Sequence, residues 1–279
     1  MSLFCSPEDV KALLRPPRPK PPRQSPRAMA KVKQLRTLDA ISRYGHLRCA
    51  EIAAAVFPSA KYSLQLSQRV VKKLLARGQI ASRRNSLGTT SYVLTRRGAA
   101  ELQLNGKAAR HGLDISAVTG GTCRHSVLCA RYCIEQEKVG FTAWHEYAIL
   151  QGRAPISKEQ LIESYGKLPD AVLIEEDKLW LVEVESAAKS TDTLSRICSV
   201  VGRVGRRLHH NVNLELQGVI FVFDGSLGHA VRIARAARNI WVDRCLAEQR
   251  ELAARIAICR VDIGLPLVWR GYKTEALSI

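Results

Sequence analysis

Two short apolar runs separated by three acidic residues constrain the fold of this chain more than any other stretch. Ala171–Ile174 and Leu179–Val182 flank Glu175, Glu176 and Asp177. Apolar runs joined by so short a polar turn predict a tight β-hairpin of two largely buried strands. We therefore expect the chain to be organised around this hairpin.

Acidic residues mark both strands of the predicted hairpin. Asp170 begins the first strand, and Glu183 and Glu185 lie two apart on the second, so their side chains leave the same face. Neighbouring carboxylates repel one another unless a cation neutralises them, and Mg²⁺ prefers such oxygen ligands. If the site is active, the pattern indicates that Asp170, Glu183 and Glu185 converge on Mg²⁺ or Mn²⁺, with Glu146 as a candidate fourth acid. Solvated acids at a sheet edge are the alternative.

Pro169-Asp170, the short hairpin and Glu183-Val184-Glu185 resemble the PD-(D/E)xK signature of the restriction-endonuclease-like superfamily. The resemblance implies that Asp170 and Glu183 hold the metal. Glu185 stands where the family usually has the Lys that assists the attacking water. Some restriction enzymes of the superfamily carry Glu there, whereas many other members with altered motifs only bind DNA.

Positive charge is concentrated in the first part of the chain. Residues 1–110 hold 22 Lys and Arg against 5 Asp and Glu, a net +17 of the total +18, whereas the remaining residues hold 21 against 20. A basic front joined to a near-neutral back indicates a nucleic-acid-binding module attached to a second domain. Membrane-surface binding is the competing interpretation, but no lipidation signal or long basic amphipathic anchor accompanies the charge.

The first residues predict a disordered basic tail over 1–30. Residues 15–27 alternate Pro with Arg and Lys, a composition that favours extended polyproline II and cannot form a core. From Lys31 the spacing predicts three helices, the first ending at Gly45, the second at Pro58 and the third running from a Ser63 cap to Gly78. Two short strands around the turn 85–89 follow.

Three helices and a hairpin in this order resemble a winged helix-turn-helix over residues 31–104. On the third helix Leu66, Val70 and Leu74 are expected to face the core. The side chains expected to reach base edges or phosphates are Gln65, Gln68, Arg69, Lys72 and Lys73, with Arg83 and Arg84 on the wing. Protein contacts or a merely solvated face are the alternatives.

Residues 105–121 predict a linker and residues 122–279 an endonuclease-like domain, its central mixed sheet flanked by helices. A helix is expected around His125–Glu137, where His125 is either a ligand or a capping or core residue. A second helix is expected after a Thr191 cap. It presents Arg196, Arg203 and Arg207. These arginines, or Lys189, either replace the missing Lys or hold a phosphate, and a solvated basic face is the alternative. A buried strand over 217–224 and a long helix from Leu227 to Arg255 follow. The fold class predicted for the whole chain is α/β, or α+β overall.

A winged helix, a helix beginning near a His, Trp144-x-Glu146 and then Pro169-Asp170 with the Glu183-x-Glu185 strand together resemble the replication-relaxation family, which includes mobilisation protein C of conjugative plasmids. The resemblance implies a relaxosome accessory protein that binds duplex DNA and recruits a relaxase, initiator or transposition partner. An Mg²⁺-dependent endonuclease of restriction or transposase-subunit type, using Asp170, Glu183 and Glu185, is the first alternative. A transcriptional regulator is the second.

The apolar runs and the cysteines of the sequence indicate the cellular compartment of the protein. No run of 18 apolar residues occurs and the N-terminus is charged and Pro-rich, so we expect a cytoplasmic protein with no membrane partner. The eight cysteines never form CxxC, which indicates reduced, mostly buried thiols. The same chain could also form a homodimer, so we keep that among the expected partners.

Overall fold

The computed structural model describes residues 25–111, 122–185, 190–205, 207–209, 212–224, 227–264 and 268–277. The chain divides into two compact units, residues 1–32 and 33–279. In the first, the described residues begin helix α2 (Pro26–Tyr44), where the Ser25 hydroxyl accepts a hydrogen bond from the Ala28 N–H. Residues 26–30, expected to belong to a disordered tail, are therefore helical, and residues 1–24 lie outside the described part.

After α2 the chain forms a small three-stranded antiparallel sheet with helices around it. Its strand order is β1-β3-β2, so the strand before α3 pairs with the second strand of the hairpin. The elements are β1 (His46–Arg48), α3 (Cys49–Val56), α4 (Ser63–Ala76), β2 (Ile80–Arg84), β3 (Thr90–Leu94) and α5 (Arg96–Leu104). The three expected helices and the hairpin are present, whereas β1 and α5 were not predicted.

The local sequence explains α4 and the hairpin that follows it. Ser67, Val71 and Leu74 are buried along one side of α4, at the three- and four-residue spacing of a helix face. Ser63 is the first helical residue and Tyr62 occupies the cap position, which corrects the expected Ser63 cap. In the turn, the Asn85 carboxamide oxygen accepts from the N–H groups of Leu87 and Thr89, which closes the hairpin at the expected residues 85–89.

The rest of the chain forms a mixed seven-stranded sheet with helices on both faces. Its order is β10-β9-β8-β6-β5-β4, with β7 beside β8. β6, β8 and β9 run parallel, and the remaining pairs are antiparallel. The elements are α6 (Thr122–Lys138), β4 (Thr142–His145), α7 (Glu146–Leu150), α8 (Lys158–Tyr165), β5 (Ala171–Glu175), β6 (Lys178–Glu185), α9 (Thr191–Ser199), a 3-10 turn (Val200–Arg203), β7 (Arg207–His209), β8 (Val212–Asp224), α10 (Leu227–Ile240), α11 (Leu246–Ala254), β9 (Ile256–Gly264) and β10 (Val268–Ala276).

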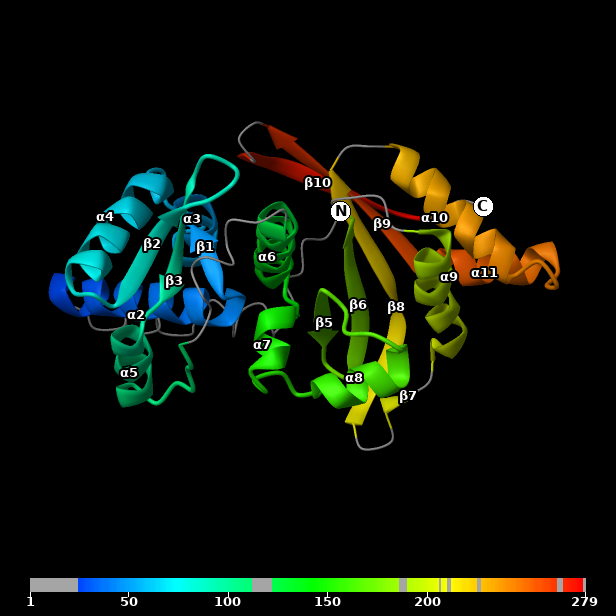
Figure 1. Ribbon diagram of the computed structural model, residues 1–279, viewed down its shortest axis with the longest axis horizontal. Helices are drawn as coiled ribbons and strands as arrows, with labels where there is room; N and C mark the ends of the chain where they lie inside the picture. Colours follow the sequence, from blue (N-terminus) through cyan, green and yellow to red (C-terminus); the bar gives the residue numbers. More distant parts are fainter. Residues whose placement is uncertain are drawn as a thin grey trace, which may run out of the picture. The chain divides into compact units, whose positions relative to one another are not determined.

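Alternation along β6 divides the core between the two faces of this sheet. Val182 and Val184 belong to the cluster that includes buried residues of α6, whereas Leu179 and Leu181 belong to the cluster that includes buried residues of α8, α9 and α10. α9 packs against α10 on the second face (Figure 1). The chain is thus a mixed α/β protein, and the predicted hairpin is β5–β6 at the centre of its larger sheet.

Two predicted helices differ from the observed ones. α9 begins after a Ser190 cap, one residue before the expected Thr191, and it ends at Ser199. Arg203 therefore lies in the 3-10 turn and Arg207 on β7, so the predicted line of arginines along one helix is wrong. The long helix expected over 227–255 is two helices, because residues 241–245 leave the helix before α11 begins.

Contacts within residues 33–279 also join α2 to the elements after residue 122. Arg43 of α2 forms an ion pair with Glu137 of α6 and donates to the Ala143 carbonyl. Arg153 donates to the Ser42 hydroxyl at 2.9 Å and lies 3.3 Å from the Asp39 carboxylate. Among the described residues, no helix combines the length and apolar character that crossing a membrane requires.

Candidate functional site

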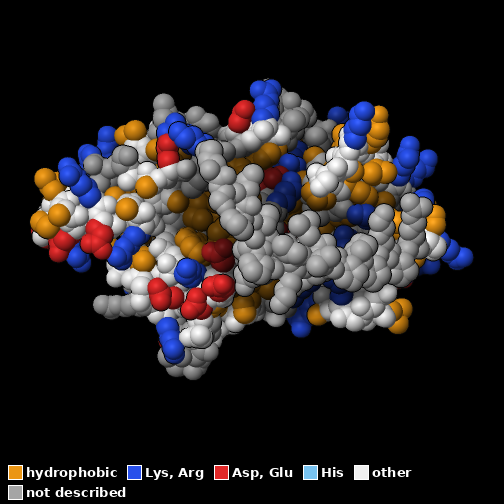
Figure 2. Space-filling model, turned by 180° about the vertical axis from the view of Figure 1, so that it is seen from behind, with side chains coloured by type: hydrophobic (Ala, Val, Ile, Leu, Met, Phe, Trp, Pro, Cys, Tyr) orange, Lys and Arg blue, Asp and Glu red, His pale blue; other side chains and the backbone are white. Residues whose placement is uncertain are grey.

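The outer side of α4 carries the polar side chains that the sequence predicted for DNA. Gln65, Gln68, Arg69, Lys72 and Lys73 are all exposed, because the buried stripe of α4 occupies the opposite side. Arg83 and Arg84 are exposed at the end of β2, next to the Asn85 turn. Figure 2 shows Lys and Arg side chains at many places on one face, with Asp and Glu in several smaller groups among them.

Asp170 lies just before β5 and is held by two protein groups. Its Oδ2 accepts a hydrogen bond from the Val184 N–H at 2.7 Å, and its Oδ1 lies 3.1 Å from Nε2 of His125 on α6. The main-chain carbonyl of Asp170 accepts from the Glu146 N–H at 2.8 Å. Asp170 therefore connects the start of β5 to β6, α6 and α7.

Glu183 is completely buried on β6, and both of its carboxylate oxygens have protein partners. Oε1 accepts from the Tyr165 hydroxyl at 2.8 Å, and Oε2 lies 2.5 Å from Nζ of Lys167. Burial, followed by the charge of Glu183, raises the pKa of Tyr165 well above its ordinary value, so this phenol remains a hydrogen-bond donor. A buried carboxylate requires such compensation.

The structure brings Glu146 close to this cluster and places Glu185 farther along β6. Burial raises the pKa of Glu146, and the nearby Asp170 raises it further, while His125 and Lys167 oppose the shift. Glu185 is buried on the same side of the strand as Glu183. Burial, together with the charge of Glu185, raises the pKa of the Cys198 thiol on α9 to about 12.

The carboxylates predicted to hold a metal ion have protein partners in this structure. Both oxygens of Glu183 already accept from Tyr165 and Lys167, and its side chain has no exposed surface. In the part of the chain that the structure describes, no group of three His, Cys, Asp or Glu side chains has the geometry of a metal site. Asp170 contacts His125 and the Val184 N–H, and Glu183 contacts Tyr165 and Lys167.

Tyr165 and Lys167 are the cluster residues that sequence reasoning missed, because α8 was not predicted. The sequence does contain the signals of α8. Ser157 and Gln160 form a capping box at its start, and Gly166 ends it at a φ of 81°. Lys167 follows that glycine, three residues before Asp170. It is the lysine that approaches the acids, whereas the predicted substitute Lys189 lies outside the described residues.

The described cysteines are all free thiols. Cys123, Cys129, Cys133, Cys198 and Cys259 are buried, as expected, and Cys49 is partly buried. Cys245 is the exposed exception among the described cysteines, most of which are buried as expected. The thiol of Cys129 donates to the Asp170 carbonyl at 3.4 Å, so it belongs to the packing around the acidic cluster.

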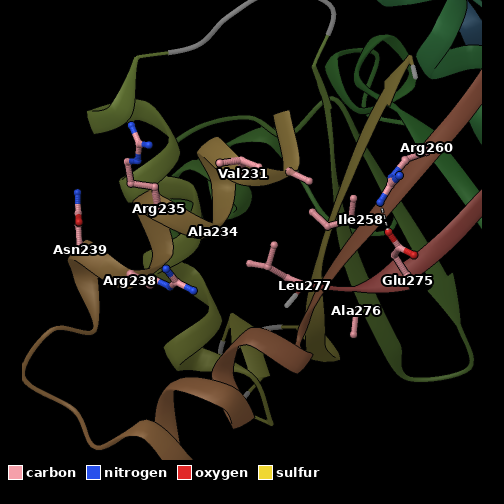
Figure 3. A pocket seen from close by; sticks show the side chains of 11 residues that line it. Val231, Ala234, Arg235, Arg238, Asn239, Ile258, Arg260, Glu275, Ala276 and Leu277 are labelled. Carbon is pink, nitrogen blue, oxygen red and sulfur yellow. Dashed lines mark hydrogen bonds and ion pairs between the residues drawn. The ribbon is translucent and has the colours of Figure 1, made fainter. Parts of the chain in front are cut away.

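Two of the three arginines predicted for phosphate binding lie together. Arg196 and Arg203 line a cavity of 390 Å³ beside the end of α8, which Lys167 also lines. Arg207 lies on the short strand β7 and is not among the residues that line this cavity. Another cavity of 420 Å³ lies between α10 and the β9–β10 pair (Figure 3).

No family model, no curated protein and no solved structure matches this chain.

Proposed function

We propose that this protein binds duplex DNA through α4 and the β2–β3 hairpin, and that it acts as a non-cleaving accessory protein in plasmid mobilisation or replication. The observation that carries the proposal is the outer side of α4, where Gln68 and Arg69 lie between Gln65 and the Lys72-Lys73 pair. Gln and Arg are suited to base edges, and Lys to phosphates.

The order of elements supports this interpretation. A helix preceded by a shorter helix and followed by an antiparallel hairpin is the arrangement in which a recognition helix enters the major groove. The exposed Arg83 and Arg84 lie where a hairpin would meet the adjoining backbone or minor groove. The excess charge of residues 1–110 supplies the sequence-independent part of the affinity.

The state of the acidic cluster favours an accessory role over cleavage. Asp170 and Glu183 are engaged by Val184, His125, Tyr165 and Lys167, so the cluster resembles a structural network that joins β5 and β6 to the surrounding helices. Such a network is expected to stabilise a platform for a relaxase or initiator partner.

A metal-dependent DNA endonuclease is the second candidate. The observation that favours it is Lys167, which supplies beside Glu183 the cationic side chain that the Glu183-x-Glu185 motif lacks. This candidate requires that the Tyr165 and Lys167 contacts rearrange when DNA binds.

Selection of bound duplexes from a random pool tests the first proposal. The Gln68→Ala/Arg69→Ala variant is expected to lose sequence preference while retaining weak, salt-sensitive binding. Lys158→Ala, which removes an exposed charge from α8, is the control. An unchanged selected sequence in the α4 variant would remove α4 from the DNA interface.

Incubation with supercoiled plasmid and Mg²⁺ or Mn²⁺ separates the two candidates. We expect the DNA to be bound without nicking. Metal-dependent nicking that disappears in Asp170→Asn, a variant that retains an oxygen acceptor for the Val184 N–H, would establish the endonuclease and reject the accessory role.

A further inference from the structure

A cavity between the end of α8 and α9 gathers positive charge on the side of the sheet where Glu183 is buried. It encloses 390 Å³, and its walls include Lys167, Arg196 and Arg203 together with the hydroxyl-bearing Thr193 and Ser199. Glu163 is the acidic residue on the same walls. Three cations therefore surround a space that one carboxylate borders.

Two of these cations are available to a ligand. Arg196 and Arg203 are exposed, and in the described ranges neither forms an ion pair with an acid. Arg203 donates to the main-chain carbonyl of Ser164, which fixes its guanidinium beside the end of α8. Because a guanidinium carries five donors in a planar fork, a second ligand can still be bound by the donors that Ser164 does not use.

Lys167 has a different role in this cavity. Its ammonium lies against the buried Glu183 carboxylate, and about a third of its side chain remains exposed. The ammonium thereby compensates the Glu183 charge, so the carboxylate repels an anion in the cavity only weakly. The positive potential of Arg196 and Arg203 then dominates the cavity.

The cavity between α10 and the β9–β10 pair, shown in Figure 3, has a different lining from the cavity between α8 and α9. Val231, Ala234 and Leu277 make much of its wall apolar. Arg260 at its rim is paired with Glu275. Arg235 and Arg238 of α10 also line this cavity, so it is basic as well, but it has no lysine and no hydroxyl-bearing side chain among the described residues that line it, unlike the cavity between α8 and α9.

We propose that the cavity between α8 and α9 binds a phosphate group, with Arg196 and Arg203 as its ligands. Guanidinium groups recognise phosphate oxygens through paired hydrogen bonds, and the Thr193 hydroxyl lines the same cavity. The Ser199 hydroxyl donates to the Arg196 main-chain carbonyl and so helps to hold that residue in place. This site is separate from α4. The phosphate belongs either to a nucleic-acid backbone or to a free phosphate compound, since both present the same oxygens.

The test measures two probes on the full chain. Calorimetry with inorganic pyrophosphate reports a free phosphate compound, and fluorescence anisotropy with a labelled duplex reports a backbone phosphate. The variants are Arg196→Ala and Arg203→Lys, the second of which keeps the charge but loses the planar fork. Arg250→Ala on α11 also removes an exposed arginine and is the matched control. Thermal melting checks that each variant is folded.

We expect Arg196→Ala to weaken the binding of one probe by about tenfold, Arg203→Lys to weaken it to a smaller degree, and Arg250→Ala to leave it unchanged. If Arg196→Ala weakens pyrophosphate binding, the ligand of the cavity is a free phosphate compound. If it weakens only duplex binding, the ligand is a phosphate of the nucleic-acid backbone. If Arg196→Ala binds both probes as well as Arg250→Ala does, the proposal is overturned.

The same assays distinguish this proposal from the role of α4. Lys72→Ala is expected to weaken duplex binding without changing pyrophosphate binding. If Lys72→Ala does not change duplex binding, the proposed DNA interface on α4 is contradicted. A loss of pyrophosphate binding in Arg196→Ala would still support the phosphate site.

Discussion

Nζ of Lys167 lies 2.5 Å from Oε2 of Glu183, a carboxylate with no exposed surface in the centre of the larger sheet. The two residues are 16 positions apart, and α8 together with β5–β6 brings them into contact. This pair compensates the buried charge of Glu183, so the stability of the sheet depends on Lys167.

Removal of Lys167 is expected to destabilise the fold. Lys167→Met leaves Glu183 buried without its ammonium partner, although Tyr165 still donates to it. Breaking a buried pair costs roughly 3–5 kcal/mol, and we expect the lower part of that range because a third of the Lys167 side chain is exposed. The double variant Lys167→Met/Glu183→Gln is expected to recover at least half of this loss, because the uncompensated charge is gone. Urea denaturation measures both. Equal stability of Lys167→Met and the parent would show that the pair contributes nothing.

Acidification is expected to destabilise the protein through two buried histidines. Burial lowers the pKa of His46 to about 4 and that of His145 to about 3. Both imidazoles stay neutral in the fold, whereas the unfolded chain takes up protons near pH 6.5. Below about pH 6.5 the unfolded state binds more protons, so the free energy of unfolding falls by about 1.4 kcal/mol per pH unit for each histidine. The loss continues until each folded pKa is reached.

The control for this pH dependence is His145→Asn. Asn retains a side-chain acceptor for the Tyr147 N–H, to which His145 now provides Nδ1 at 3.2 Å, and it does not titrate. Unfolding measured from about pH 7 to about pH 5.5 should show a shallower decline in this variant, at pH values where few carboxylates titrate. An identical slope would mean that His145 does not contribute.

Gly98 is expected to tolerate no side chain. A Cβ at this position would lie 2.1 Å from the main-chain oxygen of Gln79 and 2.7 Å from Cδ1 of Leu94. Gly98→Ala must separate α5 from the start of β2, and such overpacking costs about 1–3 kcal/mol or more. Gly202→Ala is the control, since no atom lies within 4 Å of its Cβ position. Thermal unfolding compares them, and equal melting temperatures would contradict the close approach.

DNA affinity is expected to depend steeply on salt through α4. Each phosphate contact contributes close to one unit to the slope of log affinity against log salt, so Lys72→Ala and Lys73→Ala should each reduce that slope by about 1. Lys158→Ala should leave the slope unchanged. Anisotropy titrations at several salt concentrations provide the measurement, and a slope that no α4 variant alters would exclude these lysines as phosphate contacts.

Local sequence alone determined the central hairpin and the exposed side of α4. The buried stripe of α4 is Ser67, Val71 and Leu74, whereas Leu66 and Val70, which were expected to face the core, are only partly buried. The β5–β6 turn and the outward set from Gln65 to Lys73 follow from strand alternation and helix periodicity, which act over neighbouring residues. The Asn85 turn was also readable, because its side chain bonds to the backbone two and four residues ahead.

Only the tertiary structure decided how the acidic cluster is neutralised. The partners of Asp170 and Glu183 come from α6 and from the end of α8, elements separated from β6 along the chain. The end of α9 and the break between α10 and α11 likewise escaped prediction, since continuous apolar spacing past Ser199 and Ile240 fits a helix equally well. Periodicity records which side of an element is buried, but it does not record which distant side chain meets it. That choice depends on how the sheet orders its strands and on the burial of a charge that must find a partner.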